Sequence, residues 1–144
     1  MSEDEFTDRM RSMVQHENTM RDQRLNWLIA SQGLLITALG FSWDKDVILV
    51  LSIAVVGLIF SVSIGANLYC NTLAIRTLAD FWGNKLKDGY KGPGITALRS
   101  EDIKPSIITI LYPWNILPGA LAAFWLFVIA YKAAILIIAA SNNA

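Results

Sequence analysis

Three long stretches of the chain are almost entirely apolar, at residues 25–43, 47–70 and 115–140. Lys132, in the third stretch, is the only charged residue among them. A bilayer core of about 30 Å is crossed by about 20 helical residues, so each stretch is long enough to span it. A soluble three-helix bundle would require a polar face on every helix, and no face of the second stretch carries a charge. The pattern therefore predicts an all-α integral membrane protein with three transmembrane helices.

The segment before the first span has a different pattern. Its apolar residues fall near one stripe at helical spacing, and charged residues of both signs lie on the opposite face. We expect residues 2–24 to form a cytoplasmic amphipathic helix that can continue directly into the first span. The stripe consists of Phe6, Met10, Met13, Val14 and Met20.

The pattern changes in a similar way after the second span. Residues 71–87 mix apolar and charged positions at helical spacing, which predicts a second cytoplasmic helix that continues from the span. Gly89, Gly92 and Pro93 then break the helical pattern. We therefore expect residues 88–114 to form a cytoplasmic connection.

The third span has an ambiguous start because Pro113 and Pro118 interrupt its apolar run. A proline is tolerated in the first turn of a helix but removes a hydrogen bond from a helix interior. We expect a short interfacial segment through Trp114 and a helix that begins near residues 115–118.

The basic residues are distributed unequally between the two sides of the predicted spans. Four arginines precede residue 25, and six lysines and arginines lie between residues 71 and 114. If the spans alternate in direction, both groups lie on the same side of the membrane. Lysine and arginine near span ends are retained in the cytoplasm. This distribution predicts a multi-pass protein of the cell membrane with a cytoplasmic N-terminus and an external C-terminus.

The composition excludes several classes of function. Twelve basic residues balance twelve acidic ones, which argues against nucleic acid as a partner because binding a phosphate backbone requires an excess of cations. Cys70 is the only cysteine and excludes an internal disulfide. His16 is the only histidine, so no second histidine exists for a zinc pair. We expect no enzyme, no metal and no cofactor.

Small residues recur at helical spacing inside the first two spans. Association of helices in lipid depends on close packing at small residues, because hydrophobic transfer contributes nothing there. We expect these residues to form helix interfaces, some of them between copies of the chain in a homo-oligomer. The residues are Gly33 and Gly40 in the first span, and Gly57, Ser61 and Gly65 in the second.

Four polar residues lie within the first two spans or at the end of the second, and they support two interpretations. In the first, Gln32, Ser63, Asn67 and Asn71 form hydrogen bonds between helices. In the second, Ser63 and Asn67 line a water-filled lumen in an oligomer. A substitution of Asn67 by leucine separates the two, since it would weaken assembly in the first case and conductance in the second.

Lys132 lies within about 12 Å of the end of the third apolar run. Its side chain can extend outward to water, or it can form an ion pair with Asp44 or Asp46 in the turn between the first two spans. In the alternative interpretation, Asp44 and Asp46 form a ring at the outer mouth of a cation pore.

Four short runs carry a resemblance to a known family: His16-Glu17, Arg21-Asp22-Gln23-Arg24, Trp27-Leu28 and Gln32-Gly33-Leu34-Leu35. These runs resemble the opening of small multi-pass bacterial membrane proteins, and the tight hairpin of spans with the helix that follows it is similar to the SLATT group of membrane effectors in bacterial conflict systems. The resemblance covers residues 14–87. It implies a bacterial inner membrane and pore formation or membrane perturbation.

Two hypotheses of different class follow. In the first, the chain is a homo-oligomeric channel or pore with a skirt of cytoplasmic helices. In the second, it is a non-conducting membrane anchor or regulatory subunit that binds a partner protein through those helices.

Overall fold

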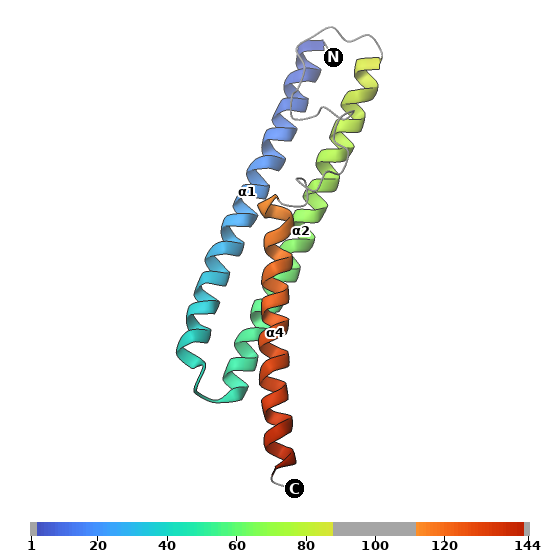
Figure 1. Ribbon diagram of the computed structural model, residues 1–144. Coiled ribbons are helices and arrows are strands. Elements are labelled where there is room, and N and C mark those ends of the chain that lie inside the picture. The colour runs from blue at the N-terminus through green and yellow to red at the C-terminus, as the bar shows by residue number, and fades with distance from the viewer. Residues whose placement is uncertain (1–2, 88–111, 143–144) are drawn as a thin grey trace.

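The computed structural model describes residues 3–87 and 112–142. They form three helices, α1 (Glu3–Ser42), α2 (Val47–Lys87) and α4 (Pro113–Ser141) (Figure 1). Each of the three is long and apolar enough to cross a membrane. The predicted helical fold with three potential spans is therefore confirmed for the described residues.

The helices α1 and α2 are each much longer than a membrane is thick. With 40 and 41 residues, each is about 60 Å long at a rise of about 1.5 Å per residue. The apolar run occupies the C-terminal half of α1 and the N-terminal half of α2, and the polar segments continue each helix without a break. Predictions for residues 88–111 lie outside the described part of the chain.

The helix α4 begins two residues earlier than the earliest start expected from the sequence. Tyr112 is its N-cap, and Pro113 occupies the first helical position, where a proline removes no helical hydrogen bond. Trp114 is therefore helical and not part of a separate interfacial segment. Pro118 lies inside the helix and is buried, and a Cβ on Gly65 of α2 would lie 3.1 Å from its ring.

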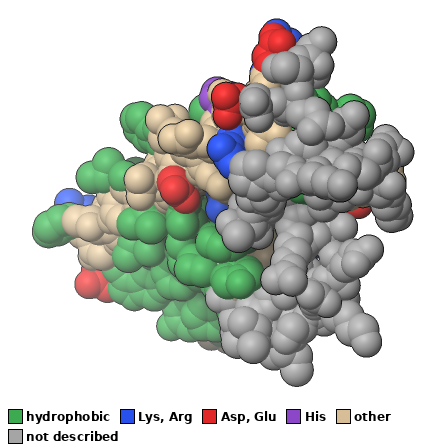
Figure 2. Space-filling view, turned by 90° about the horizontal axis from the view of Figure 1, so that it is seen from above, with side chains coloured by type: hydrophobic (Ala, Val, Ile, Leu, Met, Phe, Trp, Pro, Cys, Tyr) green, Lys and Arg blue, Asp and Glu red, His purple; other side chains and the backbone are tan. Residues whose placement is uncertain are grey.

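The three helices do not pack equally. α2 packs along both α1 and α4, whereas α1 and α4 approach each other closely at few positions (Figure 1). α1 and α4 run in the same direction, and α2 runs opposite to both. The main core lies between the spans, and Figure 2 shows hydrophobic side chains gathered on the outer surface as well. The core consists of Leu39, Val50, Ala54, Trp125 and Val128.

A second, smaller core lies where the start of α1 meets the end of α2. Met10 and Val14 of α1 are buried against Trp82 of α2. The ring of Phe6 stacks on that of Trp82 with centroids 6.0 Å apart and planes 8° from parallel. We call these paired segments, residues 5–24 of α1 and 71–84 of α2, the stalk.

Gly57 permits a close contact between α2 and α4. A Cβ on Gly57 would overlap the indole ring of Trp125, and both residues are buried. Gly119 of α4 is also helical, but no atom lies within 4 Å of the position that its Cβ would take. Gly57 is therefore required by packing, and Gly119 is not.

We predict that Gly57→Ala destabilises the folded protein in detergent by about 1–3 kcal/mol, because the added methyl group forces Trp125 out of its position. Gly119→Ala is the matched control and should be stabilising by about 0.5–1 kcal/mol, since it removes only backbone freedom. Thermal or denaturant unfolding of the purified variants measures both effects. Equal behaviour of the two variants would contradict the packing described here.

Candidate functional site

A cluster of polar groups joins all three helices inside the spans. The Gln32 Nε2 atom donates hydrogen bonds to the Gly57 carbonyl oxygen at 3.1 Å and to Ser61 Oγ at 3.0 Å. The Gln32 Oε1 atom accepts a hydrogen bond from Trp125 Nε1. The Ser61 hydroxyl itself donates to the Gly57 carbonyl at 2.9 Å. We call Gln32, Gly57, Ser61 and Trp125 the three-helix cluster.

Every side-chain N–H group of the three-helix cluster donates to an acceptor within the same chain. An amide has two N–H donors and an indole has one, and the contacts above give each of them an acceptor. Gln32 is 2% exposed, and Ser61 and Trp125 are fully buried. An unpaired polar group buried in hydrocarbon is costly, so such a closed set holds helices together. The cluster thus fits the interpretation of Gln32 as an interhelical contact.

Sequence reasoning identified Gln32, Gly57 and Ser61 but missed Trp125. The signal was available, because a tryptophan in the middle of a span carries an N–H group that needs an acceptor when it is buried. Nothing in the local pattern identified Gln32, 93 positions away, as that acceptor.

Lys132 contacts the end of α1. Its Nζ atom donates a hydrogen bond to the Trp43 carbonyl oxygen at 2.8 Å and lies 4.1 Å from the centroid of the Trp43 ring. The lysine is 8% exposed. The carbonyl end of a helix carries partial negative charge, and an aromatic face attracts a cation. Both explain how Trp43 holds this charge in an apolar setting.

The two acidic residues considered as partners of Lys132 do not contact its ammonium group. Among the described residues, neither Asp44 nor Asp46 forms an ion pair with Lys132. The Asp46 carboxylate instead accepts a hydrogen bond from the Ile48 backbone N–H at 3.0 Å, which caps the start of α2. Asp44 is exposed. The ion pair, one of the two interpretations of Lys132, is not formed among the described residues, and Lys132 contacts Trp43 instead.

Side chains bridge α1 and α4 at three levels. Besides Gln32 with Trp125 and Trp43 with Lys132, the Arg21 guanidinium carbon lies 4.2 Å from the centroid of the Trp114 ring. Arg21 and Gln32 are 11 residues apart, which is about three helical turns, so they share a face of α1. Trp43 follows 11 residues later, directly after the last residue of the helix. This spacing explains how two helices with few close backbone contacts keep a parallel register.

The remaining polar candidates of α2, Ser63, Asn67 and Asn71, do not all face a neighbouring helix. Asn71 is 2% exposed, and its Nδ2 atom donates to the Glu17 carbonyl at 3.0 Å and to the Glu17 carboxylate. Asn67 is exposed, and its Nδ2 atom donates to the Ser63 carbonyl one turn earlier at 2.9 Å. Ser63 is exposed too. Asn71 thus joins α1 to α2, whereas Ser63 and Asn67 lie on the outer surface of α2.

The small residues also separate into two groups. Gly57, Ser61 and Gly65 lie where α2 meets its neighbours, beside Trp125, Gln32 and Pro118. Gly33 and Gly40 of α1 are exposed, and no atom lies within 4 Å of the positions that their Cβ atoms would take. The second group has no packing role within the described chain.

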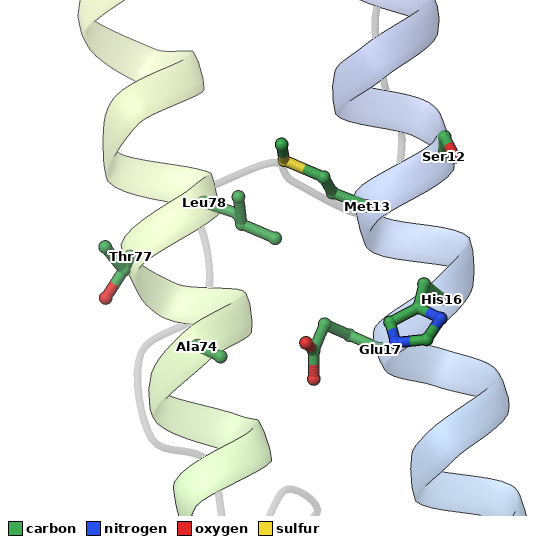
Figure 3. Close-up of a pocket in the computed structure, with 7 residues that line it drawn as sticks. All are labelled: Ser12, Met13, His16, Glu17, Ala74, Thr77 and Leu78. Carbon is green, nitrogen blue, oxygen red and sulfur yellow. The ribbon is translucent and has the colours of Figure 1, made fainter.

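The stalk contains a groove of about 540 Å³ between its two helices (Figure 3). Met13 of α1 and Leu78 of α2 approach each other across it, and the Glu17 carboxylate points from α1 toward α2. His16 lies at the edge of the groove beside Glu17. The described residues contain no group of three potential metal ligands. The residues that line this stalk groove are Ser12, Met13, His16, Glu17, Ala74, Thr77 and Leu78.

No family model, curated protein or solved structure matches this chain. The resemblance to small bacterial membrane proteins and to the SLATT group therefore stays a prediction, which rests on the four sequence runs and on the tight hairpin with the helix that follows it. Function has to be inferred from the two features described above, the three-helix cluster and the stalk groove.

We predict that Gln32 and Trp125 are energetically coupled. In a double-mutant cycle of Gln32→Leu and Trp125→Phe, each single change leaves a buried partner unpaired, and the double change removes both. The coupling free energy should be about 0.6–2 kcal/mol, as for hydrogen bonds between membrane helices. Unfolding in detergent micelles provides the four free energies that the cycle needs.

The control is Thr37→Val combined with Trp125→Phe. Thr37 is exposed and donates its hydroxyl proton to the Gly33 carbonyl of its own helix at 2.8 Å. Its effect should add to that of Trp125→Phe within about 0.5 kcal/mol. A coupling as large for this pair as for Gln32 would contradict the role given to the three-helix cluster.

Proposed function

We propose that this chain is a homo-oligomeric, non-conducting module of the bacterial inner membrane that binds a partner protein through its stalk groove. Its three apolar helices would anchor it in the bilayer, with the stalk in the cytoplasm. The distribution of lysine and arginine supports this orientation, since the N-terminal segment and residues 71–114 hold ten of the twelve basic residues.

The observation that carries the proposal is that three buried polar side chains of the spans have their partners within one chain. Gln32, Ser61 and Lys132 are all occupied by contacts between helices. Two exposed hydroxyl groups in the spans donate to their own helix, Thr37 to Gly33 and Ser52 to Ile48, each at 2.8 Å. Hydroxyls that bond in this way are compatible with lipid. None of these groups requires a water-filled lumen.

The stalk groove supports a role in protein binding. Its volume falls in the range of sites that hold a ligand or an inserted side chain, about 300–1,000 Å³. Met13 is 51% exposed and forms an apolar wall with Leu78, while the Glu17 carboxylate lies deeper between the helices. An amphipathic helix with one apolar anchor and one nearby cation would match this surface.

The exposed face of α1 supports assembly between copies. Ala30, Gly33, Thr37 and Gly40 are all exposed within the span. Small residues at helical spacing allow two helices to approach closely in lipid. A glycine inside a helix lowers its stability relative to alanine, and contacts with a second copy would offset that cost at Gly33 and Gly40.

A pore between copies is the second candidate function. It is favoured by Ser63 and Asn67, which lie exposed on α2 at intervals of one turn. If α2 faced the axis of an oligomer, these side chains would line a polar path outside the individual bundle. A pore would conduct ions across a bilayer, whereas the module of the first proposal would not, so a conductance measurement distinguishes the two.

The first test uses a photo-crosslinking amino acid placed in living cells at position 13 or 78, within the stalk groove. We expect both positions to crosslink to the same protein of different mass from this chain. Position 15 is the matched control, because Gln15 is exposed on the other side of α1 and does not line the groove. Crosslinks from position 15 alone, or only to a second copy of the chain, would contradict the proposed partner site.

The partner should be lost in a Met13→Asp variant, because a charge on the apolar wall of the groove disfavours an apolar anchor. Gln15→Asp adds the same charge on the opposite face and should leave the complex unchanged. Circular dichroism of both purified variants checks that helical content is preserved. Equal recovery of the partner with both variants would overturn the role of the groove.

For the pore candidate, we predict that reconstituted protein shows no conductance above that of empty bilayers, and that Asn67→Leu changes neither conductance nor native mass. A stable conductance that Asn67→Leu reduces at least threefold, with the oligomer intact, would favour the pore instead. Native mass in nanodiscs reports the subunit number in the same samples. A monomer under these conditions would contradict assembly through α1.

A further inference from the structure

The four arginines of α1 fall into two groups with different partners. In the stalk, Arg9 forms an ion pair with Glu5 at 3.1 Å, and Arg11 forms one with Asp8 at 3.8 Å. Arg21 and Arg24 form no ion pair with any described residue. Their positive charges are therefore not compensated by the part of the chain that the structure describes.

Arg21 and Arg24 are instead held by neutral groups. The Arg21 Nη2 atom donates to Asn18 Oδ1 at 2.9 Å, and its guanidinium group lies over the Trp114 ring. The Arg24 Nη1 atom donates to the Asn67 carbonyl oxygen at 3.2 Å. Contacts of this kind fix the position of a guanidinium group and leave its full charge in place.

The nearest carboxylates along α1 do not change this balance. Glu17 lies one turn before Arg21 but accepts its hydrogen bonds from Asn71. Asp22 follows Arg21 directly and is exposed, and successive residues of a helix point about 100° apart. Neither carboxylate is within ion-pair distance of Arg21 or Arg24 in the described structure.

Both arginines lie at the level where the spans begin. Arg24 immediately precedes the apolar run of α1. Trp27, one turn further, is 72% exposed. On α4, the rings of Tyr112 and Trp114 stack with centroids 4.6 Å apart at the start of the helix. Aromatic residues concentrate at the headgroup level of a membrane, so in a membrane that the three helices span, the two arginines would lie at the level of the lipid phosphates.

We infer that Arg21 and Arg24 bind the phosphate groups of anionic membrane lipids. Arginine recognises phosphate through several N–H donors at once, and Arg21 and Arg24 each use one Nη atom for the neutral contacts described above. The neutral partners hold both guanidinium groups at the headgroup level without competing for the anion. The lipids would steady the junction of the stalk and the spans, where α1 meets α2 and α4.

This inference rests on the part of the proposed function that places the three helices in a membrane. It does not depend on a partner protein, on conductance or on oligomerisation. If the chain remained soluble without detergent, the proposal that it lies in a membrane would fail. The experiment below uses protein that requires detergent, so its failure would contradict the lipid site alone.

The experiment measures retained lipid by native mass spectrometry after the full chain, purified in neutral detergent, is mixed with phosphatidylglycerol or phosphatidylcholine. We expect phosphatidylglycerol to bind more tightly to the unaltered chain. Arg21→Gln combined with Arg24→Gln should weaken its binding about fivefold per arginine. Arg9→Gln combined with Arg11→Gln is the matched control, which removes the same charge from the stalk and should leave binding unchanged.

A second variant distinguishes loss of the lipid site from loss of the folded structure. Arg21→Lys combined with Arg24→Lys keeps both charges and should retain most of the preference for phosphatidylglycerol, while circular dichroism reports helical content. Equal binding of both lipids, or an equal loss in the Arg9 and Arg11 control, would overturn the inference. Competition by millimolar inorganic phosphate as effective as that by the lipid would overturn the assignment to a lipid.

Discussion

The arrangement of the three helices depends on the side-chain amide of Gln32. It donates to α2 through Gly57 and Ser61 and accepts from α4 through Trp125, so one group from α1 sets the position of both neighbours. In a bilayer, hydrophobic transfer would not drive these helices together, which would leave close packing and hydrogen bonds to do so. Both act at the same place here, because Gly57 supplies an acceptor and also the space for the Trp125 ring.

The bridges from α1 to α4 extend this constraint along the whole length of the spans. Arg21 with Trp114, Gln32 with Trp125 and Trp43 with Lys132 join the two helices through long side chains. Each bridge combines an aromatic group with a polar or charged one. Such contacts hold two parallel helices in register at a separation that small side chains would not reach. They also leave an adjacent face of α1, with Gly33 and Gly40, open to the surroundings.

The stalk and the spans use the same kinds of residue under different conditions. In the stalk, aromatic rings form an apolar core, as Phe6 does with Trp82, and exposed arginines pair with carboxylates. Within the spans, aromatic rings serve as partners for polar groups and for Lys132. The change occurs near Arg21 and Arg24, where cations meet neutral acceptors and a ring. α1 and α2 are continuous through this level and connect the stalk to the spans.

The sequence by itself determined the number of potential spans, their approximate limits and the continuity of α1 and α2. These properties depend on uninterrupted apolar runs and on the absence of helix breakers, and both are local. The early start of α4 at Pro113 follows a local rule as well, which tolerates a proline in the first turn of a helix. The sequence also identified Gln32, Gly57 and Ser61 as residues of interest.

Only the tertiary structure decided which partners these residues have. The carboxylates of Asp44 and Asp46 are obvious partners for Lys132 in the sequence, yet the carbonyl and ring of Trp43 hold it. The stripes that contain Gly33 and Gly57 look alike in the sequence, but only the second is packed within the chain. The reason is geometric: a helical pattern defines the faces of a helix, and the positions of the other helices decide which face is covered.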